Sequence, residues 1–210
     1  MADTKVTALT ENTTPILTDI MYIVDDPGGS AASQKITLAN LKTVVAGRVL
    51  INEASPSATT TVTWDSIPNV YRHLEIELMG RTDNAGSTVD NVYIYCNNDT
   101  TATNYMRQLH EDYDTTNTTA EADTPAHMQI AGNTAPANSA GSGRAFILDY
   151  TGTTFYKYID AISCSRRATA TIHMDRIVSE WESTVAITRI DLIATGNFIS
   201  GSKARLYGVY

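Results

Sequence analysis

The sequence is poor in cysteine and lacks the spacing of a structural zinc site. Its 210 residues include only two cysteines, Cys96 and Cys164, and neither a CxxC nor an HxxxH pattern. Structural zinc sites are usually built from four Cys and His side chains at short, regular spacing. One cysteine pair is no disulfide framework, and the sequence leaves open whether the two are joined. We therefore expect no structural zinc.

Long apolar runs and clusters of basic residues are also missing. No segment approaches the roughly 18 apolar residues of a membrane-spanning helix, and residues 1–5 lack the start of a signal peptide. There are 15 Lys and Arg against 23 Asp and Glu, a net charge of −8, and the longest basic run is Arg166-Arg167. Nucleic-acid binding needs clustered cations to contact phosphates. We expect a soluble protein, made without Sec export, that neither enters a membrane nor binds nucleic acid.

Uncharged polar residues are abundant instead. Thr, Ser and Asn form runs such as residues 58–61 and 115–119. Threonine favours strands, and asparagine and serine favour turns, which predicts an all-β chain with long polar loops. Residues 97–103 and 112–138 are the two predicted loop segments, and the second is too long for a tight hairpin. Such loops either bind a ligand or only decorate the surface, and the sequence does not decide between these alternatives.

Apolar residues alternate with other residues over several short runs, as in half-buried strands. The clearest inward sets are Leu74, Ile76 and Leu78; Val92, Ile94 and Cys96; and Phe146, Leu148 and Tyr150. Further strands are expected at residues 155–163, 169–178, 186–194 and 203–210. Eight or nine strands in residues 51–210 predict an antiparallel β-sandwich or jelly-roll-like domain.

Residues 1–50 are predicted to form an N-terminal arm for attachment or oligomerisation. The turn-forming residues 25–30 indicate a small hairpin, and Thr37 is a candidate cap for a short helix at residues 38–45 that ends before Gly47. A helix of this length needs a surface to pack against. We expect the arm to dock through apolar side chains, on a partner chain or on its own domain. The candidates are Leu9, Ile20, Tyr22, Ile23, Leu38 and Leu41.

No catalytic, cofactor-binding or metal-ligating set is predicted. His110, Glu111 and Asp112 include two carboxylates, as glycoside cleavage requires, but the simpler interpretation is an acidic entry to a loop. Ser142 lies in a GSG sequence that lacks the spacing of a GxSxG nucleophile turn. His73 and His173 are expected at a surface or an interface, as lone histidines on strand patterns.

Two further residue types have both a structural and a binding interpretation. The Asx-rich stretches around Asp83, Asp90 and Asn97 offer oxygens for Ca²⁺, but they lack EF-hand spacing, and side-chain to backbone hydrogen bonds in turns explain them more simply. Four of the 11 tyrosines are expected to share an outward sheet face, where they would contact another subunit or seat a sugar or protein ligand. These four are Tyr93, Tyr95, Tyr156 and Tyr158.

Several stretches resemble virion proteins of tailed bacteriophages. The N-terminal resemblance is to a leader found on fibres and on head or tail appendages, and it comprises residues 6–9, 19–29 and 34–41. The rest of the chain is similar to a phage β-sandwich family at residues 67–74, 81–83, 148–150 and 196–210, so that the resemblance covers most of the sequence.

The resemblance implies a non-enzymatic virion component, a homotrimer assembled in the bacterial cytoplasm and displayed on the particle surface. Its partners would be its own copies and the major capsid protein or other virion proteins. The chain has no internal repeat and no heptad run, unlike long fibres, which favours a head decoration (cement) protein or short head fibre. The alternative is a tail fibre or tail-associated receptor-binding protein that recognises a host-surface glycan.

Overall fold

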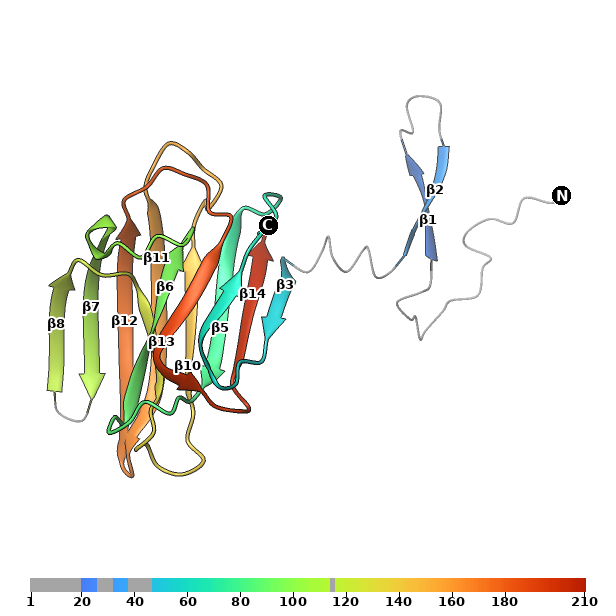
Figure 1. The fold of residues 1–210 in the computed structure, drawn as a ribbon. Helices are drawn as coiled ribbons and strands as arrows, with labels where there is room; N and C mark the ends of the chain where they lie inside the picture. The colour runs from blue at the N-terminus through green and yellow to red at the C-terminus, as the bar shows by residue number, and fades with distance from the viewer. Residues whose placement is uncertain (1–19, 26–31, 38–46, 114–115) are drawn as a thin grey trace. The chain divides into compact units, whose positions relative to one another are not determined.

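The computed structural model describes residues 20–25, 32–37, 47–113 and 116–210 (Figure 1). The chain divides into two compact units, Met1–Gly47 and Arg48–Tyr210. In the first unit, β1 (Ile20–Asp25) pairs antiparallel with β2 (Ala32–Thr37). The predicted helix at residues 38–45 lies outside the described residues. Of the apolar arm residues, Ile20, Tyr22 and Ile23 are on β1, and Leu9, Leu38 and Leu41 lie outside the described residues.

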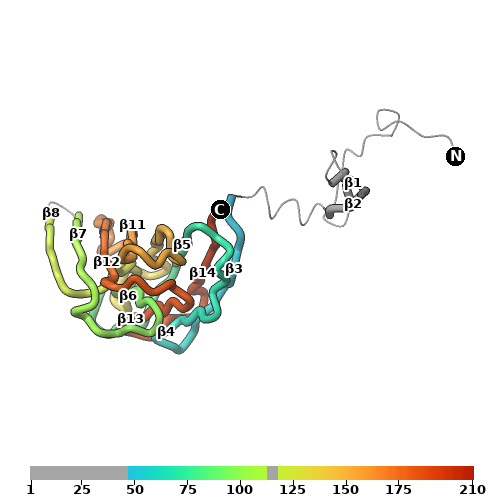
Figure 2. Tube along the Cα trace, turned by 90° about the horizontal axis from the view of Figure 1, so that it is seen from above, coloured from blue at the N-terminus to red at the C-terminus, as the bar shows by residue number. Residues whose placement is uncertain are grey.

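The second unit consists of two antiparallel sheets, which confirms the all-β prediction. Its elements are β3 (Arg48–Ala54), β4 (Thr59–Trp64), β5 (His73–Gly80), β6 (Val89–Cys96), the 3-10 turn η2 (Ala102–Asn104), β7 (Tyr105–Tyr113), β8 (Thr116–Ala122), β9 (His127–Ala131), β10 (Gly141–Ile147), β11 (Lys157–Ala168), β12 (Thr171–Trp181), β13 (Ile190–Phe198) and β14 (Lys203–Val209). An eight-stranded sheet has the order β3-β14-β5-β10-β11-β12-β7-β8, and a four-stranded sheet the order β4-β13-β6-β9. Figure 2 shows them as two layers, with β4, β6 and β13 in one and β5, β11, β12 and β14 in the other. Because β3 begins at Arg48, residues 48–50 belong to the eight-stranded sheet and not to the arm.

The core lies between the two sheets and explains the period-two pattern. Leu74, Ile76 and Leu78 are buried on β5, and Val92, Ile94 and Cys96 are buried on β6, as their alternation predicts. On β11, buried and exposed residues alternate strictly over the first ten positions. Each fully buried large apolar side chain contributes about 1.5–3 kcal/mol. Burial of one face of each sheet therefore fixes the register of its strands.

The set Phe146, Leu148 and Tyr150 is inward only at Tyr150, which follows β10 and is fully buried in the core. Within β10 the inward face is the opposite one: Ala145 and Ile147 are buried, and Phe146 is half-buried on the other face. Leu148, just after the strand, is 53% exposed. Apolar residues occupy both faces at this position, so that their alternation did not indicate which face is buried. Close packing supplies the missing constraint, because a Cβ at Gly143 would lie 2.8 Å from Cβ of Met128 on β9. Only a glycine lets the two strands approach this closely at the inner face.

Residues 112–138 are not a single loop, contrary to the prediction from their composition. They include β8 and β9, and all five residues of β9 are buried. The irregular stretch that remains, residues 132–140, is held by Arg81. The guanidinium of Arg81 donates hydrogen bonds to the carbonyl oxygens of Asn133 (2.7 Å), Ala135 (2.9 Å), Pro136 (2.9 Å) and Ser139 (3.4 Å).

We expect Arg81→Met to release residues 132–140 while the sandwich stays folded, because four carbonyls lose a charged donor. Hydrogen bonds to charged groups contribute about 1.5–3 kcal/mol each, and part of this is recovered by water. Amide protection in the loop should fall by about 10–100-fold in hydrogen exchange, with strand amides unchanged. Arg144→Met is the matched control, since Arg144 is 65% exposed and has one long ion pair, to Glu75. Equal protection of the loop in both variants would contradict this role of Arg81.

Candidate functional site

The four tyrosines predicted to share a face lie on different sheets, so this prediction was wrong. Tyr93 and Tyr95 are half-buried on β6 of the four-stranded sheet, and Tyr95 packs edge-on against Tyr105. Tyr156 and Tyr158 are 46% and 50% exposed, just before and within β11 of the eight-stranded sheet. Alternation along one strand identifies neighbours on that strand but not which strands share a sheet. No surface containing all four is therefore available to a ligand.

The carboxylates of the His110-Glu111-Asp112 sequence do not form a pair. All three residues lie within β7, and not at the entry to a loop. Because successive side chains of a strand point to opposite faces, Glu111 faces the interior while His110 and Asp112 face outward, 3.2 Å apart. His173, which we expected at a surface, is only 1% exposed. His173 contacts Glu111 inside the sandwich, so the two form a buried cluster that is separate from the outward pair of His110 and Asp112.

The Asx-rich stretches bind backbone groups. Asp83 accepts a hydrogen bond from the N–H of Asn197 (2.6 Å), and Asp90 accepts one from the N–H of Gly196 (2.9 Å). Asn97, at a left-handed φ of +51°, accepts hydrogen bonds from the N–H groups of Thr188 (2.9 Å) and Arg189 (3.1 Å). Asparagine tolerates this conformation better than most residues. The bonds run from side chain to backbone as expected, but they join segments far apart in the sequence and do not form local turns.

The two cysteines are free. Cys96 is fully buried in the core, and burial raises the pKa of its thiol strongly. Cys164 is exposed on the outward side of β11, in line with Ser142. A buried thiol of this kind behaves as a small apolar side chain.

The surface that stands out is the outward side of the eight-stranded sheet, which we call the outer face. Large apolar side chains are exposed on it from five strands. They are Leu50 (β3), Met79 (β5), Met106 (β7), Tyr158 and Ile162 (β11), and Ile172, Met174 and Val178 (β12), each between 41% and 68% exposed. Soluble monomers rarely leave so many apolar side chains together on one face, and such patches mark contact sites.

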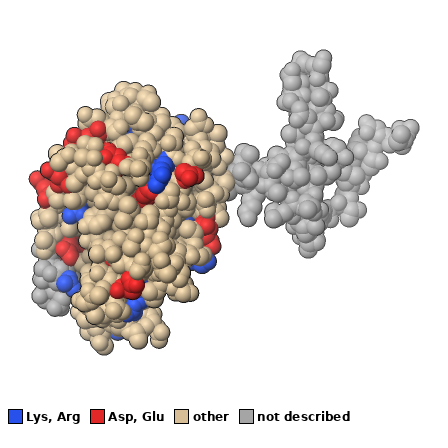
Figure 3. Space-filling view, viewed as in Figure 1, with Lys and Arg blue, Asp and Glu red and all other residues tan. Residues whose placement is uncertain are grey.

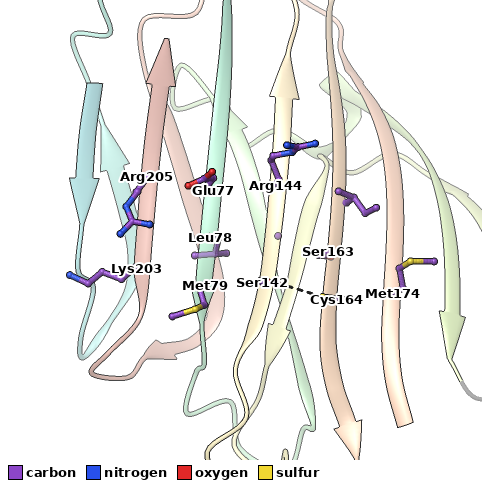
Figure 4. A pocket seen from close by; sticks show the side chains of 12 residues that line it. Glu77, Leu78, Met79, Ser142, Arg144, Ser163, Cys164, Met174, Lys203 and Arg205 are labelled. Carbon is purple, nitrogen blue, oxygen red and sulfur yellow. Dashed lines mark hydrogen bonds between the residues drawn. The ribbon is translucent and has the colours of Figure 1, made fainter. Parts of the chain in front are cut away.

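A groove crosses the outer face at a row of short side chains (Figure 4). Strand register places Met79, Ser142, Cys164 and Met174 side by side on β5, β10, β11 and β12. The small Ser142 and Cys164 lie between the longer methionines, and the resulting groove has a volume of about 530 Å³. Its floor therefore offers apolar surface between two flexible, polarisable side chains, which adapt well to a partner surface.

Charges of both signs border this groove. Glu77, Arg144, Lys203 and Arg205 line it, and Asp160 pairs with Arg176 at 3.3 Å farther along the same face. The opposite side of the sandwich, which carries the four-stranded sheet and is seen in Figure 3, shows scattered basic side chains and no basic patch in its described part. The charges of both signs around the groove suit a protein partner of similarly mixed charge better than a polyanion.

A second set of polar residues lies inside the sandwich, where β9 covers β7, β11 and β12. His127 and Asp175 are each 2% exposed, and their Nε2 and Oδ2 atoms are 3.7 Å apart. Burial lowers the pKa of the His127 ring; Asp175 opposes this, and the charge of Arg107 adds to the lowering. Burial raises the pKa of Asp175, but its interactions with His127 and His173 outweigh burial, and the pKa lies below its ordinary value.

Comparison of the chain with protein families, with curated proteins and with solved structures found no match. Within the described residues, no helix has the length and apolarity needed to cross a lipid bilayer.

Sequence reasoning did not identify the outer face or the buried polar cluster. On β11, outward apolar residues such as Ile162 alternate with buried apolar ones such as Ile159, so that both faces of this strand have apolar residues. On β12, the outward apolar residues, such as Met174, alternate with buried polar ones, such as Asp175. These outward apolar residues within 157–181 are the available signal for the outer face. The buried cluster joins strands that are distant in the sequence, and no local spacing reveals it.

Proposed function

We propose that this protein is a structural component of a bacteriophage particle, a head decoration (cement) protein or short head fibre. In this proposal the sandwich forms a homotrimer through its outer face, and residues 1–47 attach it to the major capsid protein or another virion protein. The observation that carries the proposal is the exposed apolar outer face on a domain whose core is already complete without it. The resemblance of the sequence to phage virion proteins supports the same assignment.

The composition of the outer face suits contact between copies of the chain. Methionine, tyrosine and arginine are enriched in protein interfaces, and Met79, Tyr158 and Arg176 are examples on this face. Both charge signs occur there, so one copy offers partners for the charges of the next. In a trimer each contact joins two different parts of the face, because a threefold axis makes interfaces heterologous. The outer face has exposed apolar side chains and charges of both signs, so two different parts of it can be complementary.

We expect deletion of residues 1–45 to leave a folded sandwich that no longer joins the particle. Residues 48–210 contain the described core, so the truncated chain retains its strand pairing and its core burial. The measurement adds full-length or truncated protein to particles that lack it and images the returning density. Full-length protein should appear at regular positions over the shell, and the truncated protein should be absent.

Two results would count against this proposal. Normal incorporation of the truncated protein would contradict attachment through residues 1–47. Density of the full-length protein only at the tail or at one vertex would contradict a head decoration role and favour the receptor-binding alternative. Binding of the isolated sandwich to host-surface glycans would then be the next measurement.

A further inference from the structure

Three side chains with metal-ligand chemistry meet on the inner face of the eight-stranded sheet. His173 and Asp175 lie two residues apart on β12 and so share a face, and Glu111 on β7 is directly opposite Asp175 in the ladder. Nε2 of His173 is 2.6 Å from Oε1 of Glu111 and 3.2 Å from Oδ1 of Asp175. The potential ligand atoms of all three lie within 4.8 Å of one another. Two neighbouring strands therefore hold a nitrogen and two carboxylate groups around one point.

The carboxylate of Asp175 is buried, with its side chain 2% exposed, and its neighbours among the described residues are two histidine rings. Nε2 of His173 lies 3.2 Å from Oδ1 and Nε2 of His127 lies 3.7 Å from Oδ2, but neither contact has the geometry of a hydrogen bond. The hydroxyl of Ser165, on the neighbouring strand β11 opposite His173, is also buried without a hydrogen-bond partner. Buried polar atoms without hydrogen bonds are uncommon in folded proteins and call for a partner. A cation placed among the ligand atoms of Glu111, His173 and Asp175 would be that partner for the Asp175 oxygens.

His127 lies beside Asp175, and its contact with Arg107 fixes which ring nitrogen carries the proton. Nη1 of Arg107 lies 2.7 Å from Nδ1 of His127, and since arginine only donates, Nδ1 must accept. The neutral ring then carries its proton on Nε2, the atom that faces Oδ2 of Asp175. At 3.7 Å this contact is too long for a hydrogen bond, but carboxylates that bind metals commonly have a donor on this side. His127 is therefore a partner of the carboxylate and not a fourth ligand.

We propose that Glu111, His173 and Asp175 bind one Zn²⁺ ion inside the sandwich. Imidazole nitrogen suits zinc, and two carboxylates with a water molecule complete a four-coordinate sphere. At bond lengths of about 2.0–2.2 Å, tetrahedral ligand atoms stand about 3.4 Å apart, so the Glu111 carboxylate moves by less than about 1 Å to bind. Glu111 has that freedom, since its side chain is 22% exposed at the border of the cluster.

Ligand type and number favour zinc over calcium. The cluster combines two carboxylates with an imidazole nitrogen, and imidazole is a ligand that suits zinc. Calcium needs six or more oxygens, and the cluster offers one nitrogen and two carboxylates. This inference does not depend on the proposed virion role, because the site lies within one copy of the chain.

The test is titration of the chelator-treated full-length protein with Zn²⁺ by isothermal calorimetry. We expect one Zn²⁺ per chain and a midpoint of thermal unfolding that rises by about 5–10 °C at 100 times the dissociation constant. Glu111→Gln and Asp175→Asn should each weaken binding by at least about 100-fold, since loss of even an outer partner costs 10–100-fold. Co²⁺ in place of Zn²⁺ should give visible absorption bands that both variants lose.

His110→Gln is the matched control. His110 lies on the same strand as Glu111, beside the carboxylate of Asp112, but on the outward side, where its side chain is 45% exposed. This variant should bind Zn²⁺ as the original chain does. Glu111→Gln keeps the test decisive if Asp175→Asn fails to fold. Absence of saturable binding, equal affinity of Glu111→Gln and the original chain, loss of binding in His110→Gln, or tighter binding of Ca²⁺ than of Zn²⁺ would each overturn the proposal.

Discussion

We expect replacement of Ile162 and Met174 together by glutamate to convert the proposed trimer into a folded monomer. Both side chains point outward on neighbouring strands, with 46% and 42% of their surface exposed, so their loss leaves the core intact. In an interface, each would contribute about 1–2 kcal/mol of apolar burial, and two carboxylates would add a desolvation cost. The dissociation constant should therefore rise by at least about 100-fold.

Light scattering during gel filtration measures this change directly. The original protein should elute with the mass of three 22.8-kDa chains, and the double variant with the mass of one. The far-ultraviolet circular dichroism of the two should agree. The matched control is the double variant Val70→Glu with Val185→Glu. Val70 is 64% exposed and Val185 is 59% exposed, and both lie in loops between strands rather than on the outer face. A monomeric original protein, or a trimer that persists in the Ile162/Met174 variant, would contradict assembly through the outer face.

How much of the fold could be predicted from the sequence depended on how regularly apolar and polar residues alternate along each strand. β5 and β6 alternate between buried apolar residues and others, and their inward residues Leu74 and Ile94 were predicted correctly. β10 has apolar residues on both faces, and its inward face was predicted wrongly. β8 and β9 were missed because threonine, alanine and polar residues such as His127 lack an apolar alternation, although β9 is entirely buried.

The candidate sites followed much less from the sequence, because both depend on strand order. The eight-stranded sheet brings β5, β10, β11 and β12 together, so that Met79 and Met174, 95 positions apart, border one groove. The buried cluster likewise needs β7 beside β12, since Glu111 and Asp175 meet only through that pairing. A periodic pattern reports which side of a strand is buried. It contains no information about the strand on the other side of the ladder.

Asp90 is the described residue whose replacement we expect to destabilise the fold most through lost hydrogen bonds. It is 2% exposed on β6, and it accepts hydrogen bonds from the hydroxyl of Thr82 (2.7 Å) and from the N–H groups of Thr195 (3.3 Å) and Gly196 (2.9 Å). Thr195 and Gly196 lie where β13 departs from regular pairing with β4. One carboxylate therefore joins β6, the segment after β5 and the irregular part of β13.

Asp90→Ala should lower the free energy of unfolding by about 3–5 kcal/mol, because it leaves three donors without their acceptor and each unsatisfied buried group costs about 1–3 kcal/mol. Asp83→Ala is the matched control. Asp83 accepts hydrogen bonds from the backbone and the side chain of Asn197, but it is exposed. Water can replace the lost carboxylate, so the loss in free energy of unfolding should stay below about 1 kcal/mol. Urea unfolding in the monomeric Ile162/Met174 background removes any contribution from assembly. If the two aspartate variants lose equal stability, burial of the acceptor does not determine the effect, and the role assigned to Asp90 is wrong.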